Sequence, residues 1–344
     1  MSSPAYPAHV PLAEATRGDA VESIHYGSVA VVDRDGHVVH SAGDPHALTF
    51  TRSALKPLQA LPFVAAGGVE RFGYSPEQTA LLCASHSGEP RHVVAVADML
   101  ARAGLHANDL QCGTQPPGFY ETRGDVPPPP PYSPLQHNCS GKHSGMLAWC
   151  VQCGAPTADY LAFDHPLQQA IRRAVSTFTG VAEARLVPGI DGCSAPNYAV
   201  PLSGLARAFA RLASPAVDAD YGDAPRTLAA AMTVHPEMVS GELRSDLALM
   251  RAGGGDWVTK VGAEGVQAIG VRSLGLGIAV KVADGQRRAL YPAVVSVLDQ
   301  LGLVRDAATR AALAPWARGT LRNYRQTETG VVRSVLVLDK DARA

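Results

Sequence analysis

Apolar and polar residues alternate over His25–Ser41, on both sides of the polar tetrad at 33–36. Alternation with a period of two predicts strands, and an Asp-Gly turn between two such runs predicts a β-hairpin. Leu274–Ala283 alternates in the same way, and Gly330–Leu338 has the pattern of a final strand. The segment Arg288–Leu301 is expected to form a strand and then a helix. Strands are therefore expected near both ends of the chain.

Helical patterns occupy the middle of the chain, where they are bounded by proline, glycine and capping residues. Ser75 followed by Pro76 combines an N-cap residue with a proline at the first helical position. The long segment 111–138 is expected to be a loop, because it contains five consecutive prolines. Helices are predicted over Thr51–Gly68, 75–83, Glu89–Ala103, Asp164–Gly180, Leu202–Leu212, Pro225–Val234 and Glu242–Ala252.

These patterns predict an α+β fold, with one antiparallel sheet built from both chain ends and a helical region contributed by the middle. Residues 1–22 contain few large apolar side chains and are expected to form a loose N-terminal leader. Residues 23–344 are expected to form a single domain. In this domain the sheet would come from about 23–50 and 256–340, and the helical region from about 51–255.

Composition limits the classes of partner. The chain has 344 residues, of which 46% are hydrophobic, and its 30 Lys and Arg balance 31 Asp and Glu. A net charge of −1 gives no electrostatic footprint for nucleic acid or an anionic membrane, so a small-molecule ligand is favoured. The sequence has no apolar stretch long enough to span a bilayer and no signal-peptide pattern, which predicts a cytoplasmic protein. Its six cysteines are then expected to be thiols, metal ligands or core residues.

Two Ser–Lys combinations carry candidate chemistry. Ser53 and Lys56 form an S-x-x-K motif that places both side chains on one helix face, where the lysine can act as a base for the serine. The motif is common by chance, and an exposed serine beside a surface lysine is the alternative. Ser85, in a Ser-His-Ser triplet, and Lys260, in a K-x-G motif, partly match the remaining motifs of serine β-lactamase-like enzymes. They predict a second Ser–Lys pair.

The segment Cys139–Gly145 brings a thiol, Lys142 and His143 together just before an apolar helical run. The start of a helix favours thiolate. A second thiol, Cys193, lies two residues after Asp191. Two thiols and a histidine can bind zinc, although the usual spacing of zinc ligands is missing. A cysteine nucleophile with His143 as its base, or two buried structural thiols, are the alternatives. For Cys150 and Cys153, core packing competes with a metal or redox role.

Together these motifs resemble the L-asparaginase II family of the Rhizobium etli inducible type, which has a serine-β-lactamase/glutaminase-like fold. The stretches that carry the resemblance are R-S-A-L-K-P (52–57), C-A-S-H-S-G-E (83–89), H-N-C-S-G-K-H-S-G-M-L (137–147), G-I-D-G-C-S-A-P (189–196) and K-V-G-A-E-G-V (260–266).

The resemblance implies hydrolysis of L-asparagine to L-aspartate and ammonia by a homodimer that contains Zn²⁺. It implies the following roles: Ser53 as nucleophile with Lys56 as base, Ser85 and Lys260 as the second pair, Cys139, Lys142 and Cys193 as zinc ligands, and Arg52, His143 and Asp191 at the substrate.

One stretch departs from the family pattern. Residues 112–117 are C-G-T-Q-P-P, where the family would have C-G-P-H-x-P, and this bears on the shape of the loop on the substrate side. Three other functions stay open on sequence grounds. They are a different Ser–Lys amidohydrolase, such as a glutaminase, a peptidase or a penicillin-recognising enzyme, a non-catalytic zinc-binding relative, and a metalloamidase that uses zinc-bound hydroxide.

Overall fold

The computed structural model describes residues 6–340, and contacts divide these into two compact units. The first unit contains the residues up to 54, residues 200–210 and the residues from 259 onward. The second contains residues 55–199 and 211–258. The mixed α+β composition, with an antiparallel sheet built from both ends of the chain, confirms the predicted fold class.

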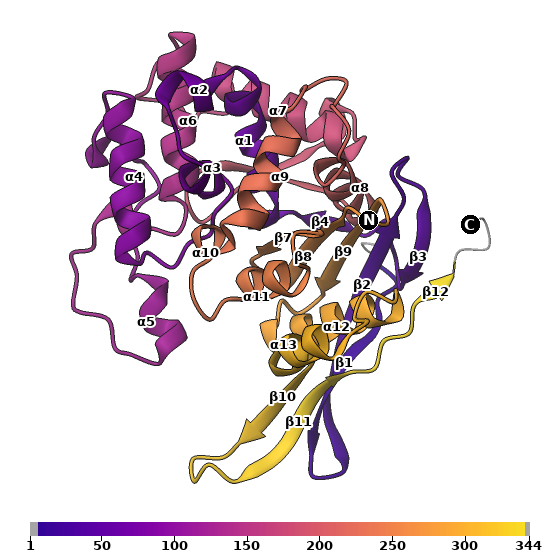
Figure 1. The fold of residues 1–344 in the computed structure, drawn as a ribbon. Coiled ribbons are helices and arrows are strands. Elements are labelled where there is room, and N and C mark those ends of the chain that lie inside the picture. The colour runs from indigo at the N-terminus through magenta and orange to yellow at the C-terminus, as the bar shows by residue number, and fades with distance from the viewer. Residues whose placement is uncertain (1–5, 341–344) are drawn as a thin grey trace, which may run out of the picture. The chain divides into compact units, whose positions relative to one another are not determined.

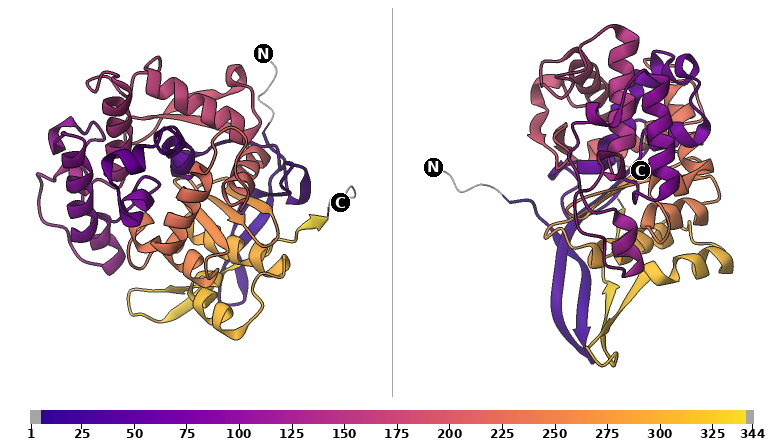
Figure 2. Two further views of the ribbon diagram at one scale, coloured as in Figure 1. Left: turned by 45° about the horizontal axis from the view of Figure 1, so that its top comes forward. Right: turned by 90° about the vertical axis from the view of Figure 1, so that its left-hand side faces the viewer.

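An antiparallel sheet dominates the first unit, and in the described residues its strands follow the order β10-β11-β1-β2-β9-β8-β7, with β3 beside β2 and β12 beside β3. Figure 1 and Figure 2 show the β1–β2 and β10–β11 hairpins extending side by side. The strands are β1 Val10–Arg17, β2 Ala20–Val32, β3 Val38–Ala42, β4 Leu48–Phe50 (outside this sheet), β7 Trp257–Gly262, β8 Val266–Val271, β9 Leu276–Val282, β10 Arg318–Arg322, β11 Glu328–Ser334 and β12 Asp339–Lys340.

Three helices belong wholly or largely to this unit: α8 (Leu202–Leu212), α12 (Arg287–Gln300) and α13 (Ala307–Ala317). Helix α12 packs on β1, β8, β9 and β11, and α8 approaches β9 so closely that a Cβ on Gly277 would meet the carbonyl oxygen of Ala206. The core between the sheet and these helices is aliphatic and includes Leu12, Val29, Val31, Ile269, Ile278, Val280, Leu290, Val294 and Leu298.

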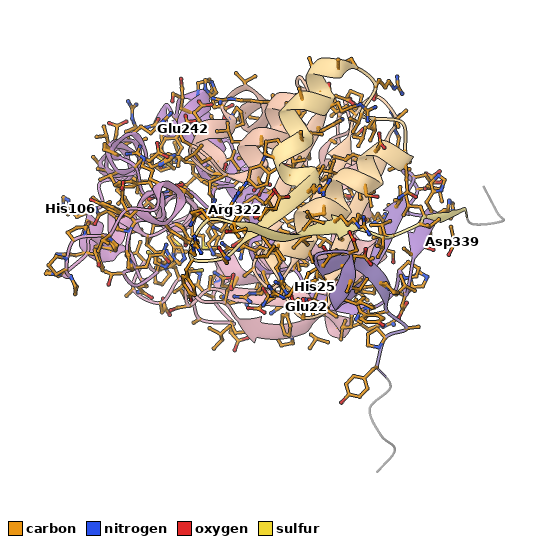
Figure 3. The ribbon with its side chains drawn as sticks, turned by 90° about the horizontal axis from the view of Figure 1, so that it is seen from below. Glu22, His25, His106, Glu242, Arg322 and Asp339 are labelled. Carbon is orange, nitrogen blue, oxygen red and sulfur yellow. The ribbon has the colours of Figure 1, made fainter. Side chains whose placement is uncertain are left out.

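A buried histidine, His25 on β2 (Figure 3), adds a polar tie to this core. Its Nδ1 lies 2.6 Å from Asp284, in the turn after β9, and its Nε2 accepts a hydrogen bond from Arg288 on α12 at 3.1 Å. Because Nε2 accepts, the ring proton is on Nδ1 and is donated to the carboxylate. His25 therefore joins β2, the β9 turn and α12 through one ring.

Two predictions for this unit are wrong. Residues 10–22 were expected to belong to a loose leader, but they form β1 and the start of β2; residues 1–5 lie outside the described part of the chain. Of the four buried residues of β1, two are alanines and one is a threonine, so the apolar pattern of this strand is weak in the sequence. The strand predicted at the start of Arg288–Leu301 is also absent, because α12 covers this segment and buries residues at helical spacing.

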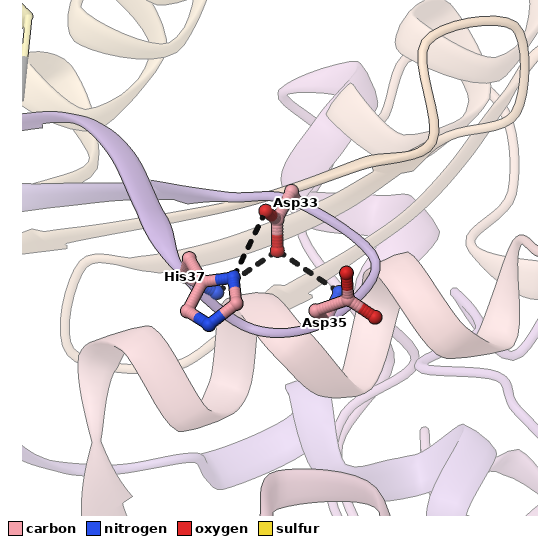
Figure 4. A group of neighbouring side chains, drawn as sticks. All are labelled: Asp33, Asp35 and His37. Atoms are coloured by element: carbon pink, nitrogen blue, oxygen red, sulfur yellow. Dashed lines mark hydrogen bonds and ion pairs between the residues drawn. The ribbon is translucent and has the colours of Figure 1, made fainter. Parts of the chain in front are cut away.

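The predicted hairpin at residues 33–36 is confirmed by the antiparallel pairing of β2 with β3. Asp33 shapes the turn by accepting hydrogen bonds from the backbone N–H groups of Asp35 and His37, both at 2.9 Å (Figure 4). Its second carboxylate oxygen lies 3.2 Å from the His37 ring. Such backbone contacts from an aspartate are typical of turns, so structure alone accounts for this cluster of acidic and histidine side chains.

The second unit is mainly helical, and its helices pack around an apolar core that includes Leu55, Leu58, Leu61, Phe63, Leu81, Met99, Leu147, Ile171 and Phe178. In it β5 (Val187–Ile190) pairs with β6 (Pro196–Pro201). Its helices are α1 Lys56–Ala65, α2 Gly68–Phe72, α3 Pro76–Leu81, α4 Pro90–Arg102, α5 Gly118–Arg123, α6 Ser140–Cys153, α7 Pro166–Thr179, α9 Ala224–Val234, α10 Pro236–Val239 and α11 Ser245–Ala252, with short 3₁₀ turns at Ala107–Asp109, Pro134–Gln136 and Glu183–Arg185.

Local sequence signals set many of these helix boundaries. Ser75 and Gln78 form the reciprocal capping box at the start of α3, and Gly67 adopts a left-handed conformation after α1. The predicted loop at 111–138 contains the short helix α5 and a 3₁₀ turn. Among residues 6–340, no helix combines the length and the apolar character that crossing a membrane requires.

Candidate active site

Lys56, the first residue of α1, is a buried lysine of the second unit. Only 1% of the residue is exposed, and its Nζ donates to the carbonyl oxygen of Ala84 at 2.5 Å and to Ser85 Oγ at 2.9 Å. A longer contact of 3.4 Å reaches the carbonyl oxygen of Asn138. Lys56 thus joins the loop after α3 to the loop before α6, and it presents its nitrogen to a serine hydroxyl.

The Ser85 loop is held by its own backbone and by His86. Ser85 N–H donates to the carbonyl of Val239 at 2.8 Å, and Gly88 N–H donates to His86 Nδ1 at 3.1 Å. His86 Nε2 lies 2.9 Å from Ser140 Oγ, which itself donates to a backbone carbonyl. Nε2 must therefore carry the proton. Burial and the neighbouring His92 keep the pKa of His86 well below its ordinary value, so the ring stays neutral and fixes the loop.

Cys139 is the N-cap residue of α6, as the sequence predicts for the loop-to-helix transition. A hydrogen bond from Cys193 and the charges of Lys56 and Lys142 lower the pKa of the Cys139 thiol well below its usual value, although burial acts in the opposite direction. Lys142 donates to Cys193 Sγ at 3.0 Å. Burial disfavours the ammonium form of Lys142, yet the two sulfur atoms raise its pKa overall. The two thiols and Lys142 therefore form one electrostatically coupled group.

His143, one residue further along α6, is completely buried. Its Nδ1 lies 2.7 Å from the Tyr160 hydroxyl, and that oxygen also accepts a hydrogen bond from Gln111 N–H at 2.9 Å. No described residue makes a hydrogen bond of good geometry with its Nε2, although Cys193 is near enough to raise the pKa of the ring. Burial and the Lys142 charge outweigh this effect and lower the pKa of His143 to about 4. A neutral imidazole with one free nitrogen thus faces the thiols.

The turn between β5 and β6 supplies Asp191 and Cys193. It is closed by hydrogen bonds from Asp191 N–H to the carbonyl of Ala195 at 3.0 Å and from Ser194 N–H to the carbonyl of Asp191 at 2.9 Å. Ser194 has a φ of 68°, which is unusual for a residue other than glycine and costs roughly 1 kcal/mol or more. This strained turn leaves Asp191 partly exposed and buries Cys193.

Arg52, Ser53 and Lys260 belong to the first unit. Ser53 is half-buried in a 3₁₀ turn, Arg52–Leu55, that leads directly into α1, and Arg52 has a left-handed φ of 47°. Lys260 on β7 is fully buried. Two residues later, a Cβ on Gly262 would lie 2.9 Å from the Thr51 carbonyl oxygen, so β7 passes directly beside the segment that ends in Ser53. The close approach of the Thr51 carbonyl thus explains why the K-x-G motif has glycine at its third position.

The donor set around Cys139 and Cys193 fits a soft metal ion. Among the described residues, three or more ligand atoms of His, Cys, Asp or Glu lie within 4.8 Å of one another only at the surface turn of Asp33, Asp35 and His37. Lys142 would be the third protein ligand of a metal held by the two thiols only after it loses its proton, and its raised pKa opposes that loss. The lowered pKa of Cys139 favours the thiolate form that binds metal.

The structure brings together Lys56, Ser85, Cys139, Lys142, His143 and Cys193 through direct contacts or shared electrostatics. It pairs Lys56 with Ser85, a contact that the sequence motifs did not indicate. Ser85 and Lys260 lie in different units, and their predicted pairing stays a prediction. Sequence analysis also assigned no role to Tyr160, which belongs to no motif, or to His137, which lies two residues before Cys139. Burial and the charge of Lys56 lower the pKa of His137 to about 4.

Cys112 is a further thiol at this site. Burial and the nearby Cys139 and Cys193 raise its pKa to about 12, so it stays protonated. Cys150 is buried in α6, where burial raises its pKa to about 12, and Cys153 is exposed. Cys150 and Cys153 do not form a disulfide bond with each other, because all six cysteines are free thiols. Core packing therefore describes Cys150 better than a redox motif does.

Comparisons with known proteins give one family match. The family model described as L-asparaginase II matches residues 13–334. No curated protein matches the sequence. A solved structure from Bacteroides dorei, provisionally described as a β-lactamase, is 12% identical with a TM-score of 0.42, covering 79% of this chain and 93% of its own. That likeness is too remote to support an argument about fold or function.

Proposed function

We propose that this chain, which belongs to the L-asparaginase II family, hydrolyses L-asparagine to L-aspartate and ammonia. Membership of the family supports an asparaginase-type amidohydrolase in general. A Ser–Lys mechanism beside a zinc site, as in the Rhizobium etli inducible type, is the finer part of the proposal. The observation that carries this proposal is the buried contact of 2.9 Å between the Lys56 nitrogen and Ser85 Oγ. A cytoplasmic location and a homodimeric assembly belong to the same proposal.

In this mechanism Ser53 attacks the side-chain amide carbon, and Lys56, as the neutral amine, takes the proton from the hydroxyl. The tetrahedral intermediate expels ammonia, and water then hydrolyses the acyl–Ser53 ester to release L-aspartate. Ser53 suits this role because it is half-buried at a strained turn, whereas Lys56 begins the next helix three residues later. Ser85 connects to Lys56 through its hydroxyl and offers a route for the proton. Proton transfer by a positioned side chain contributes typically about 10²–10⁴-fold to a rate.

An amide is a poor electrophile, so the negative charge on the tetrahedral oxygen also needs stabilisation. Backbone N–H groups near Ser53 and on the neighbouring strand β7 are the proposed donors, each worth roughly 3–4 kcal/mol. Lys260 is the proposed partner of Ser85 for protonating the departing ammonia. Arg52 would order the site around the nucleophile.

The substrate is held, in this proposal, by Asp191 and His143. A partly exposed carboxylate suits the substrate ammonium, and neutral His143 offers its free Nε2 to a polar group of the substrate. Cys139, Lys142 and Cys193 would hold Zn²⁺, which supplies positive charge for positioning, because two thiolates leave little Lewis acidity.

The decisive experiment measures ammonia release from L-asparagine and L-glutamine by the purified, zinc-loaded protein and by Ser53→Ala and Ser85→Ala variants. We expect loss of roughly 10³-fold or more for Ser53→Ala, as for other serine nucleophiles. Ser176→Ala on α7 is the matched control, because Ser176 is also half-buried and lies outside the proposed machinery. A pocket that fits asparagine would disfavour the extra methylene of glutamine by about 10–200-fold.

The same measurements separate the alternatives. Faster release from glutamine would indicate a glutaminase on the same scaffold. An unchanged rate in Ser53→Ala would remove that serine from the mechanism and favour zinc-bound hydroxide or a cysteine nucleophile. Zinc binding without ammonia release from either amide would indicate a non-catalytic relative.

A further inference from the structure

A cavity of about 540 Å³ lies in the first unit between α12, α13 and the β10–β11 hairpin. Its volume falls within the range of small-molecule sites, roughly 300–1,000 Å³. Half of its twelve lining residues are aliphatic: Pro292, Val295, Val304, Leu313, Ala314 and Ala317. The other half are polar or charged: Ser296, Asp299, Arg310, Arg318, Arg333 and Ser334. None of these residues belongs to the proposed active site.

The same cavity is bordered by an unusual row of charges. The strand register places Arg318 of β10 directly opposite Arg333 of β11, and Arg333 directly opposite Glu14 of β1. Like charges in directly opposed positions of an antiparallel pair destabilise it. Both arginines line the cavity, so the two like charges that repel each other belong to its lining.

Only one of the cavity's positive charges lacks a partner. Arg333 forms an ion pair with Glu14 at 2.7 Å, and Arg310 lies 3.6 Å from Asp299. No acidic side chain in residues 6–340 comes within 4.0 Å of the Arg318 guanidinium. A smaller cavity, also lined by Arg318, is lined by Asp19 and Glu328 as well, but neither carboxylate forms an ion pair with Arg318.

A cavity with an aliphatic half and one uncompensated guanidinium in its lining is complementary to an aliphatic chain that ends in a singly charged acid. The planar guanidinium matches a carboxylate with two parallel hydrogen bonds. A single negative charge would also relieve the repulsion between the opposed arginines, whereas a phosphate dianion would exceed the one charge available. We propose that this cavity is a second ligand site, separate from the active site, that binds a small amphipathic monocarboxylate through Arg318.

The test is calorimetric titration of the full-length protein with octanoate, and with octan-1-ol as the neutral probe of equal chain length. We expect one octanoate per chain, and binding weaker by on the order of tenfold or more for Arg318→Ala and for octan-1-ol. Arg322→Ala is the matched control, because it removes the same charge from the far end of the same strand, and Arg322 does not line the cavity.

A second variant keeps the test decisive if Arg318→Ala folds poorly. Ala314 is exposed on α13 and lines the cavity, so Ala314→Phe fills it without burying new surface elsewhere, and it should abolish octanoate binding. The proposal is overturned if wild-type protein binds no octanoate at millimolar concentration. It is equally overturned if Arg318→Ala, Arg322→Ala and Ala314→Phe all bind octanoate as the wild type does.

Discussion

Replacing Gly262 with alanine tests how β7 positions the proposed nucleophile. An added Cβ would lie 2.9 Å from the Thr51 carbonyl oxygen, 3.2 Å from Val266 Cβ and 3.3 Å from Arg52 Cβ. The first distance involves backbone and is shorter than ordinary contact, so β7 or the Thr51–Arg52 segment must move. Gly262 does not have a left-handed φ, and alanine therefore adds no backbone strain that would complicate the result.

The magnitude follows from this geometry. Overpacking of this kind costs about 1–3 kcal/mol of unfolding free energy. Because Ser53 directly follows Arg52, a displacement of the segment also moves the proposed nucleophile, and misplacement by about 1 Å can cost 10²-fold in rate. We expect Gly262→Ala to lower kcat/KM for L-asparagine by about 10–100-fold.

Urea unfolding and steady-state ammonia release, measured on the same preparations, separate the two effects. Gly319→Ala is the matched control on another strand of the same sheet, since its added Cβ would meet nothing closer than Val332 Cβ at 3.7 Å. If Gly262→Ala loses stability and keeps full kcat/KM, the contact is structural only, and the argument that β7 positions Ser53 fails. If both properties match the wild type, the steric argument itself is wrong.

Three further predictions concern the second unit. Lys56→Met removes the amine and keeps the chain length, so ammonia release should fall about 10²–10⁴-fold, and a loss below threefold would exclude Lys56 from proton transfer. Removing zinc with a chelator should raise KM for L-asparagine more than it lowers kcat; a lost kcat at unchanged KM would contradict a positioning role. His86 has a depressed pKa in the folded state, so the unfolded chain binds its proton first as pH falls. The free energy of unfolding should therefore decline below about pH 6.5 by roughly 1.4 kcal/mol per pH unit because of His86. Urea unfolding of His86→Gln should show a shallower decline with pH than the wild type, and equal slopes in the two proteins would refute this assignment.

Local chemistry made some elements predictable from the sequence. The Ser75 cap with Pro76, and the Asp33 turn, act through backbone groups within four residues, so they form wherever the chain carries them. Elements that depend on tertiary contacts were harder. Strand β1 buries mainly small side chains and is stabilised by pairing with β2 and β11, and the sequence of β1 alone contains little of that information.

The candidate site shows the same limit at the level of side chains. The spacing of Ser53 and Lys56 suggested a local pair, yet the serine that Lys56 contacts in its own unit is Ser85, 29 residues away. That contact depends on where α3 ends and on how the Asn138 loop packs, and neither is encoded near Lys56. Cys139 and Cys193 likewise meet because a helix start and a strained turn converge. Motifs thus supplied the candidate residues, whereas long-range packing decided which side chains each of them contacts. For this reason, mutation of a packing glycine such as Gly262 tests the proposed mechanism as directly as mutation of the serines.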